Sequence, residues 1–143
     1  MPKPITLLGF DFGMKRIGVA IGQTLTQSAN PIAVLDAKDG VPNWETIQTL
    51  IQAWGADAFV VGIPYNMDGS AQATTNAAKK FAKKLQQRFG LVVYTLDERL
   101  TTLESKRQLA EEYRTTGTKM PEQVDSYAAK LILEQWLRNI DEK

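Results

Sequence analysis

The sequence contains no cysteine and no histidine, and these two absences exclude several classes of site. All 143 residues lack both side chains. Without Cys there can be no disulfide framework, no thiolate nucleophile and no Cys-ligated zinc or iron–sulfur centre. Without His there can be no Ser–His triad and no imidazole base. Any catalysis therefore has to come from carboxylates, Lys, Arg, Tyr, Ser or Thr, and any bound metal should be a hard, oxygen-liganded ion such as Mg²⁺ or Mn²⁺.

Long apolar runs and a strong excess of one charge are also missing. No apolar run approaches the roughly 20 residues that cross a membrane, and the N-terminal residues do not open a signal peptide. We therefore expect a soluble, cytoplasmic protein with no membrane partner. The 17 Lys and Arg against 16 Asp and Glu give a net charge of +1, which argues against a strongly basic nucleic-acid binder but allows a local basic face. The length predicts one domain, residues 1–143.

The hydrophobic pattern predicts three strands followed by alternating strands and helices. The expected elements are strands at Ile5–Phe12, Arg16–Gly22 and Pro31–Leu35, a helix at Trp44–Trp54, a strand at Ala58–Ile63, a helix that Ser70 caps and that includes Ala77–Phe89, a strand at Leu91–Leu96, and helices at Thr101–Arg114 and from Pro121 onward. This order predicts an α/β fold of the ribonuclease-H-like layout. Its sheet would be mixed and five-stranded, an antiparallel meander followed by β-α units, with helices on both faces.

Asp11 is a carboxylate inside an otherwise apolar stretch, Leu-Leu-Gly-Phe-Asp-Phe-Gly. An unpaired ionised carboxylate buried there would be strongly destabilising, so a metal, an arginine or backbone N–H groups must offset its desolvation. One interpretation is a functional carboxylate. The other is a strand-end Asp that caps the turn at Gly13 or pairs with Lys15 or Arg16.

Asp125 lies on the expected last helix, in line with the apolar stripe of that helix. If Pro121 is the first helical residue, Asp125 falls in the second turn and shares a face with Ala129, Ile132 and Trp136. Because this face must pack on the sheet, the carboxylate would project from the buried side of the helix. The alternative is that the helix starts at Asp125, which would then be its N-cap.

Asp97 and Glu98 follow the fifth expected strand. Sites form at strand ends of α/β sheets, and adjacent strand residues point to opposite faces, so at most one of the two can join Asp11. The alternative is that both charges simply face solvent. Carboxylates from the first strand, the fifth strand and the last helix could thus converge at one edge of the sheet. Such a group suits one or two Mg²⁺ or Mn²⁺ ions that promote phosphodiester hydrolysis.

Four segments resemble the YqgF/RuvX family in order and spacing: Phe10–Ala20, Val61–Ser70, Asp97–Thr102 and Val124–Ala129. The resemblance spans residues 5 to 137. It implies a ribonuclease-H-like nuclease, because the family is described as Holliday junction resolvases and, in bacteria, as the nuclease that processes the 5′ end of pre-16S ribosomal RNA. The implied partners are structured RNA such as pre-rRNA, branched DNA and ribosomal precursor particles. The implied protein is a monomer or a homodimer that requires Mg²⁺ or Mn²⁺.

Carried over to this sequence, the resemblance implies three catalytic, metal-binding carboxylates: Asp11, Glu98 and Asp125. Asp97 stays the alternative to Glu98 until the strand register is known. The resemblance also implies that the turn around Asn66 and Asp68 lies beside the site and adds these two residues to the candidates. For Asp68, a turn-forming Asp-Gly pair is the simpler interpretation.

Basic residues supply the candidate contacts to nucleic acid. Under the resemblance, phosphate contacts would come from Lys15, Arg16 and Arg99, and ion pairing with neighbouring acids is the alternative for them. The expected helix 77–89 carries five basic residues and no acid. Lys80 and Lys84 share one of its faces, which either contacts phosphates or is simply a solvated exterior.

Two further classes of function remain open at this stage. The hairpin Asp11–Ala20 also resembles the phosphate loop of actin-like ATPases, which would make the chain a nucleotide-binding module. A catalytically silent module that binds ribosomal RNA is the other. Thermal stabilisation by ATP but not by oligonucleotides would favour the nucleotide-binding module. A metal titration that finds no site dependent on Asp11 and Asp125 would favour the silent module.

Overall fold

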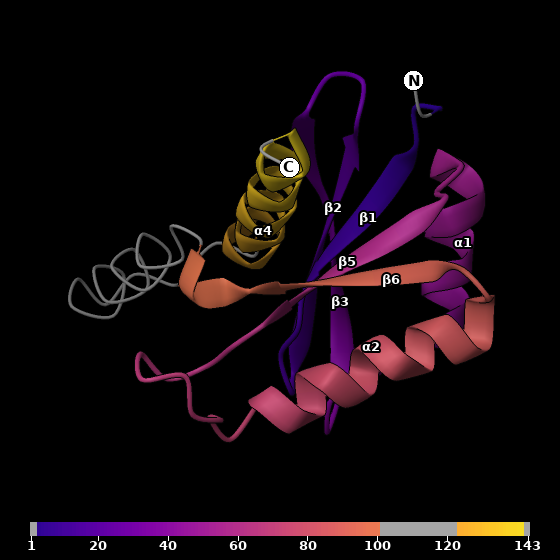
Figure 1. Cartoon of the computed structure of the whole chain (residues 1–143). Helices are drawn as coiled ribbons and strands as arrows, with labels where there is room; N and C mark the ends of the chain where they lie inside the picture. Colours follow the sequence, from indigo (N-terminus) through magenta and orange to yellow (C-terminus); the bar gives the residue numbers. More distant parts are fainter. Residues whose placement is uncertain (1–2, 101–122, 142–143) are drawn as a thin grey trace.

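The structure is a computed structural model that describes residues 3–100 and 123–141. It contains one six-stranded sheet (Figure 1). Its strands are β1 (Thr6–Asp11), β2 (Arg16–Gln23), β3 (Ser28–Lys38), β4 (Val41–Pro42), β5 (Ala58–Ile63) and β6 (Val92–Asp97). They follow the spatial order β4-β3-β2-β1-β5-β6. The first four form an antiparallel meander, and β5 and β6 run parallel to β1.

The predicted ribonuclease-H-like layout is confirmed, with six strands where five were expected. The additional strand, β4, has only two residues and pairs with Ala37 and Lys38 at the end of β3. The turn between them is the Asp39-Gly40 pair, whose φ angles of 52° and 80° are both positive, as tight hairpin turns require. So short a strand carries no hydrophobic period that the sequence could reveal.

The helices are α1 (Trp44–Trp54), α2 (Thr75–Phe89), the 3₁₀ turn η1 (Glu98–Leu100) and α4 (Gln123–Asp141). The Asn43 side chain caps α1 by accepting a hydrogen bond from the backbone N–H of Glu45, and Gly55 ends the helix in the left-handed conformation. Among these residues, none of the helices is long and apolar enough to span a membrane. The helix expected at Thr101–Arg114 and the start at Pro121 lie outside the described residues.

The expectation about the cap of helix α2 is wrong. Ser70 does not cap α2, because α2 begins at Thr75 with Thr74 as its N-cap residue. Trp54, the last residue of α1, is 48% exposed. Trp44 does pack in the core, where its ring stacks on Phe81.

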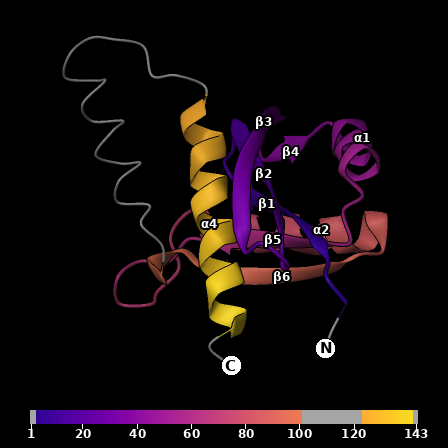
Figure 2. The ribbon, with the colours of Figure 1, turned by 90° about the horizontal axis from the view of Figure 1, so that it is seen from above.

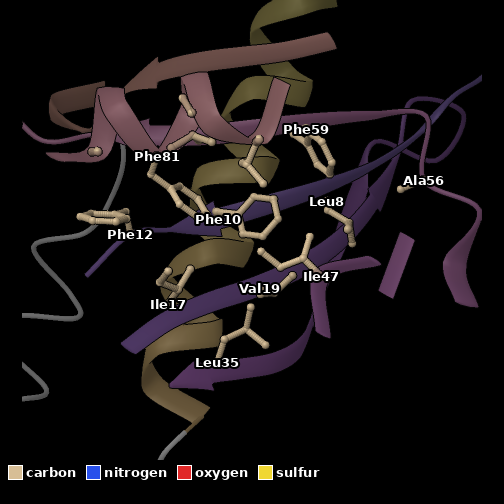
Figure 3. Packing of buried hydrophobic residues seen from close by; sticks show 14 of the residues in the cluster. Leu8, Phe10, Phe12, Ile17, Val19, Leu35, Ile47, Ala56, Phe59 and Phe81 are labelled. Carbon is tan, nitrogen blue, oxygen red and sulfur yellow. The ribbon is translucent and has the colours of Figure 1, made fainter. Parts of the chain in front are cut away.

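The sheet separates two apolar layers because alternate residues of each strand point to opposite faces. On one face, Leu8 and Phe10 of β1 pack with α1 and α2 in the larger cluster (Figure 3). On the other face, Leu7 packs with α4, and the α carbon of Gly9 lies against Leu133 of that helix. Figure 2 shows α4 along one side of the sheet and α1 beyond the other. The face that carries α4 is the one on which Asp11 falls, two residues after Gly9.

Candidate active site

Asp11 ends β1 on the α4 face of the sheet, between two glycines on the neighbouring strands. It pairs with Gly18 of β2. On the other side Phe10 pairs with Val61 of β5, so the parallel register sets Asp11 beside Gly62. Neighbouring strands lie about 4.8 Å apart, so Asp11 is within one strand spacing of both glycines. The Asp11 side chain is partly buried.

The two glycines leave room for two other acidic residues. A Cβ atom at position 18 would overlap the backbone carbonyl oxygen of Asp125. A Cβ atom at position 62 would lie 2.7 Å from Oε1 of Glu98. Asp125 therefore covers one neighbour of Asp11, and the Glu98 carboxylate covers the other. The structure brings together three acidic residues from β1, η1 and α4 on one face of the sheet.

Glu98 occupies this face and Asp97 does not. Leu96 of β6 is buried in the α4 cluster, so the next residue of the strand, Asp97, points away from α4. Glu98 begins η1 and its side chain returns over Gly62. The strand register, which the sequence does not reveal, is what separates these two candidates.

The Asp97 carboxylate is instead paired with Arg99. The Arg99 guanidinium donates from Nε to both carboxylate oxygens at 3.0 Å and from Nη2 to Oδ2 at 2.5 Å, and the backbone N–H of Arg99 donates to Oδ1 at 2.9 Å. These hydrogen bonds, first of all those from the side chain, lower the pKa of Asp97 and raise the pKa of Arg99. For Arg99 the sequence allowed either a phosphate contact or an ion pair with a neighbouring acid. These contacts match the ion pair.

Arg99 also connects the end of β6 to the loop after β5. Its Nη1 donates to the carbonyl oxygen of Met67 at 3.4 Å, and its guanidinium carbon lies 5.5 Å from the ring centre of Tyr65. The Lys79 ammonium is 5.4 Å from the same ring centre. Arg99 thus attaches the 65–70 segment to the strand end that carries Glu98.

The pair with Arg99 predicts a defined pH dependence of stability. Because its folded-state pKa is lowered, Asp97 stabilises the fold above its unfolded pKa of about 3.9, and this contribution is lost as the pH falls through the lower folded pKa. Asp97→Asn should therefore lower the melting temperature slightly at neutral pH, and the difference from wild type should vanish in acid. Thermal denaturation from pH 2 to pH 7 measures this. In an Arg99→Gln background, where the backbone N–H of residue 99 still donates to Asp97, the same substitution should cost less than in wild type, and a pH-independent cost of Asp97→Asn would contradict the assignment.

Asp125 lies near the start of the described part of α4, two residues after Gln123, which is already helical. The alternative that Asp125 is the N-cap is therefore wrong, and the predicted alignment with the buried Ala129 and Ile132 is confirmed. Its Oδ2 is 3.6 Å from Nε of Arg16. The Arg16 side chain is 48% exposed and that of Asp125 is 14% exposed, so this is a loose pair at the rim of the site.

The three carboxylates fit a hard divalent cation by chemistry but do not form a closed ligand group in their present rotamers. Across residues 3–100 and 123–141, no three Asp, Glu, His or Cys side chains are placed to hold a metal ion. The donors that Asp11, Glu98 and Asp125 offer are carboxylates, which Mg²⁺ and Mn²⁺ prefer. Ligation would require the three side chains to turn toward a common point and Arg16 to release Asp125.

The turn at Asn66–Ser70 is closed by its own polar side chains. Asp68 Oδ1 accepts hydrogen bonds from the backbone N–H of Ser70 at 2.9 Å and from its hydroxyl at 2.6 Å. These bonds, led by the one from the hydroxyl, lower the pKa of Asp68. Asn66 Nδ2 donates to the Ser70 hydroxyl oxygen at 2.9 Å. The turn-forming interpretation of Asp68 matches these contacts.

The predicted basic residues do not all gather at the carboxylates. Arg16 does so through Asp125, and Lys15 is exposed in the turn between β1 and β2. Lys80 and Lys84 lie on α2, which packs on the opposite face of the sheet, and they line a cavity together with Phe12 and Met14. Sequence spacing grouped them correctly on one helix face but could not place that face relative to Asp11.

Gly18 and Gly62 are the site residues that sequence reasoning missed. Both glycines interrupt strongly apolar strands, Ile17 to Ile21 and Ala58 to Ile63. A glycine in a strand interior often marks a close approach of another chain segment. That signal was present in the sequence, although it does not say which segment approaches.

Comparison with known proteins identifies close relatives. The sequence model of the RuvX family, described as "Holliday junction resolvase", matches residues 5–139. A Coxiella burnetii protein named "Putative pre-16S rRNA nuclease" is 66% identical over 131 residues, which cover 92% of this chain and 91% of that protein. A Legionella pneumophila protein of the same name is 50% identical over 138 residues, covering 96% and 98%.

Solved structures share the fold at low sequence identity. The structure described as "T. thermophilus RuvC in complex with Holliday junction substrate" aligns with a TM-score of 0.55 at 14% identity and covers 96% of each chain. A second Thermus thermophilus RuvC structure aligns with a TM-score of 0.53 at 15% identity, covering 96% of this chain and 97% of the other.

Proposed function

The chain belongs to the RuvX family, and on this basis we propose that it is a nuclease that hydrolyses phosphodiester bonds in the 5′ region of pre-16S ribosomal RNA. We infer the RNA substrate from the names of relatives that are 49–66% identical to the chain. The observation that carries the proposal is the position of Asp11 between Gly18 and Gly62, with Asp125 over one glycine and Glu98 over the other.

In the proposed mechanism, Asp11, Glu98 and Asp125 are the residues that would hold one or two Mg²⁺ or Mn²⁺ ions. Such ions, when bound, make water a better nucleophile and stabilise the charge that develops on the scissile phosphate. Glu98 and Asp125 approach from η1 and α4, so correct packing of both elements on the sheet orients their carboxylates around Asp11. Arg16, once released from Asp125, is available to a phosphate oxygen of the substrate, as is the exposed Lys15.

Recognition of the RNA would depend on its backbone and shape. A net charge of +1 provides little unspecific attraction to a polyanion. Five of the 17 Lys and Arg residues lie on α2, and Lys15 and Arg16 lie at the turn between β1 and β2. Structured RNA that offers phosphates at fixed positions is the substrate that such a distribution suits best.

Branched DNA is the second candidate substrate, because the family model is described as that of a Holliday junction resolvase. A resolvase makes two symmetric cuts and therefore needs two active sites. This candidate requires a stable dimer of the chain, whereas processing of one RNA end requires only one site.

A cleavage assay on both substrates tests the proposal. The full-length protein is incubated with a pre-16S leader RNA and with a four-way DNA junction, in Mn²⁺ and in EDTA. We expect cleavage of the RNA in Mn²⁺ only, and a loss of at least about a hundredfold in rate for Glu98→Gln. Asp97→Asn is the matched control one residue away and should stay within a few-fold of wild type.

The assay also distinguishes the other outcomes. Preferential cutting of the four-way junction would favour the DNA candidate. Cleavage of neither substrate, or equal losses for Glu98→Gln and Asp97→Asn, would contradict the proposed role of the carboxylates.

A further inference from the structure

A cavity of about 240 Å³ lies between α2 and two of the hairpin turns of the meander, β1–β2 and β3–β4. It is lined by Phe12 and Met14, by Asp39, Gly40 and Val41, and by Ala77, Lys80, Phe81 and Lys84 of α2. Drug-sized ligands occupy sites of roughly 300–1,000 Å³. The volume therefore suits one small planar group better than a complete dinucleotide.

The floor of the cavity is formed by two core side chains, Phe12 and Phe81, which are 8% and 2% exposed. The rings of Phe12 and Phe81 lie side by side with their centroids 5.3 Å apart (Figure 3). Gly40 packs closely on this floor, because a Cβ atom there would lie 2.8 Å from Cζ of Phe12 and 3.4 Å from Sδ of Met14. An apolar surface with a thioether at its rim accommodates a flat, polarisable ring.

The rim of the cavity is mostly basic. Lys80 and Lys84 are spaced i and i+4 on α2 and line the same side of the cavity. Asp39 is the one acidic residue of the lining. Two ammonium groups attract a phosphate, and a single carboxylate accepts hydrogen bonds from an exocyclic amino group or a ribose hydroxyl. These groups match a nucleotide.

The cavity is connected to the carboxylates through β1. Asp11 points to the α4 face, and Phe12, the next residue, points to the α2 face and lines the cavity. The exposed Lys15 lies in the turn between β1 and β2, which separates the two places. A strand with its scissile phosphate at Asp11 could pass over this turn and reach the cavity with an adjoining nucleotide.

We propose that this cavity binds one unpaired nucleotide, with its base against the apolar part of the lining and its phosphate at Lys80 and Lys84. The inference rests on the proposed function and deepens it, because it names a single-stranded RNA flank as the part of the substrate that the protein holds away from the cut. A free mononucleotide has the same chemistry, and the experiment distinguishes the two sources.

Fluorescence anisotropy in EDTA tests this binding without any cleavage. The probes are a labelled single-stranded RNA decamer, a blunt RNA duplex and unlabelled AMP as competitor. The double variant Lys80→Gln/Lys84→Gln should weaken decamer binding about tenfold at low salt and reduce the salt slope by about 1.4, which is two single-strand phosphate contacts at about 0.7 each. The matched control Lys79→Gln/Lys83→Gln removes the same charge from exposed positions of the same helix and should cost less than about twofold.

A second variant tests the apolar part of the site. Ala77→Leu places a larger side chain in the cavity without changing charge, so it should weaken decamer binding severalfold with an unchanged salt slope, while the melting temperature shows that the fold is intact. Competition by AMP would identify a free nucleotide as the ligand, and binding of the decamer without such competition would identify the substrate strand. Equal losses in the two double variants, or normal binding by Ala77→Leu, would overturn the inference. Because these binding measurements involve no cleavage, their result does not depend on whether the protein is an active nuclease.

Discussion

Asp11→Asn should reduce metal-dependent cleavage by at least about a hundredfold and leave the melting temperature unchanged or higher. The substitution keeps the size of the side chain but removes the charge from the residue at the centre of the acidic group. Asp11 lies one strand spacing from the positions covered by Glu98 and Asp125. Removing one of three neighbouring negative charges relieves repulsion in the absence of a cation. Loss of function without loss of stability is typical of a residue that serves the reaction.

Cleavage rates and thermal denaturation of the same preparations measure the two effects. Glu45→Gln is a suitable control, because Glu45 is an exposed carboxylate in the first turn of α1, an element on the other face of the sheet. This control should cleave at the wild-type rate. An Asp11→Asn protein that retains full activity would refute the assignment, and one that melts well below wild type would show that Asp11 has a structural role.

Gly18→Ala should both destabilise the protein and inactivate it. A Cβ atom at position 18 overlaps the backbone oxygen of Asp125, and a backbone atom in a helix cannot move aside alone. The first turn of α4 would therefore lift from the sheet, at a cost of about 1–3 kcal/mol in the free energy of unfolding. Because Asp125 moves with that turn, we expect cleavage to fall by at least about tenfold even where the protein remains folded.

Gly22→Ala is the matched control for this prediction. Gly22 lies on the same strand and under the same helix, but a Cβ atom there would meet Cδ2 of Leu133 at 2.7 Å and the carbonyl oxygen of Ser28 at 3.0 Å. This site is remote from Asp125 along α4, so the variant should lose stability and keep its activity. Urea denaturation and cleavage rates measured below the transition separate the two variants. Equal activity losses in both would show that general loosening of α4, and not displacement of Asp125, limits the reaction.

The fold was predictable from the sequence where a hydrophobic pattern extends over a whole helix or strand and where particular residues mark the ends of that element. Helix α1 and strand β5 have the bounds that the sequence predicted, because Gly55 stops the helix and a continuous apolar run defines the strand. Prediction failed where local polar contacts decide the structure. Ser70 has the composition of a helix cap, yet its N–H and hydroxyl both donate to Asp68 and close a turn five residues before α2.

For the candidate site, residue types were predictable and spatial neighbours were not. The apolar surroundings of Asp11 and the stripe beneath Asp125 are visible in the sequence. The choice between Asp97 and Glu98 is not, since it depends on the register that buries Leu96 under α4 and on the pairing of Asp97 with Arg99. The location of Lys80 and Lys84 also depends on which face of the sheet α2 covers, a property of the tertiary fold alone.

The central claim is that Asp11, Glu98 and Asp125 jointly bind a divalent cation on the α4 face of the sheet. Anomalous diffraction from crystals soaked in Mn²⁺ tests it most directly. We predict an anomalous peak at about 2.1 Å from carboxylate oxygens of all three residues, with Arg16 turned away from Asp125. A protein that binds Mn²⁺ only elsewhere, with Asp125 still paired to Arg16, would contradict the account.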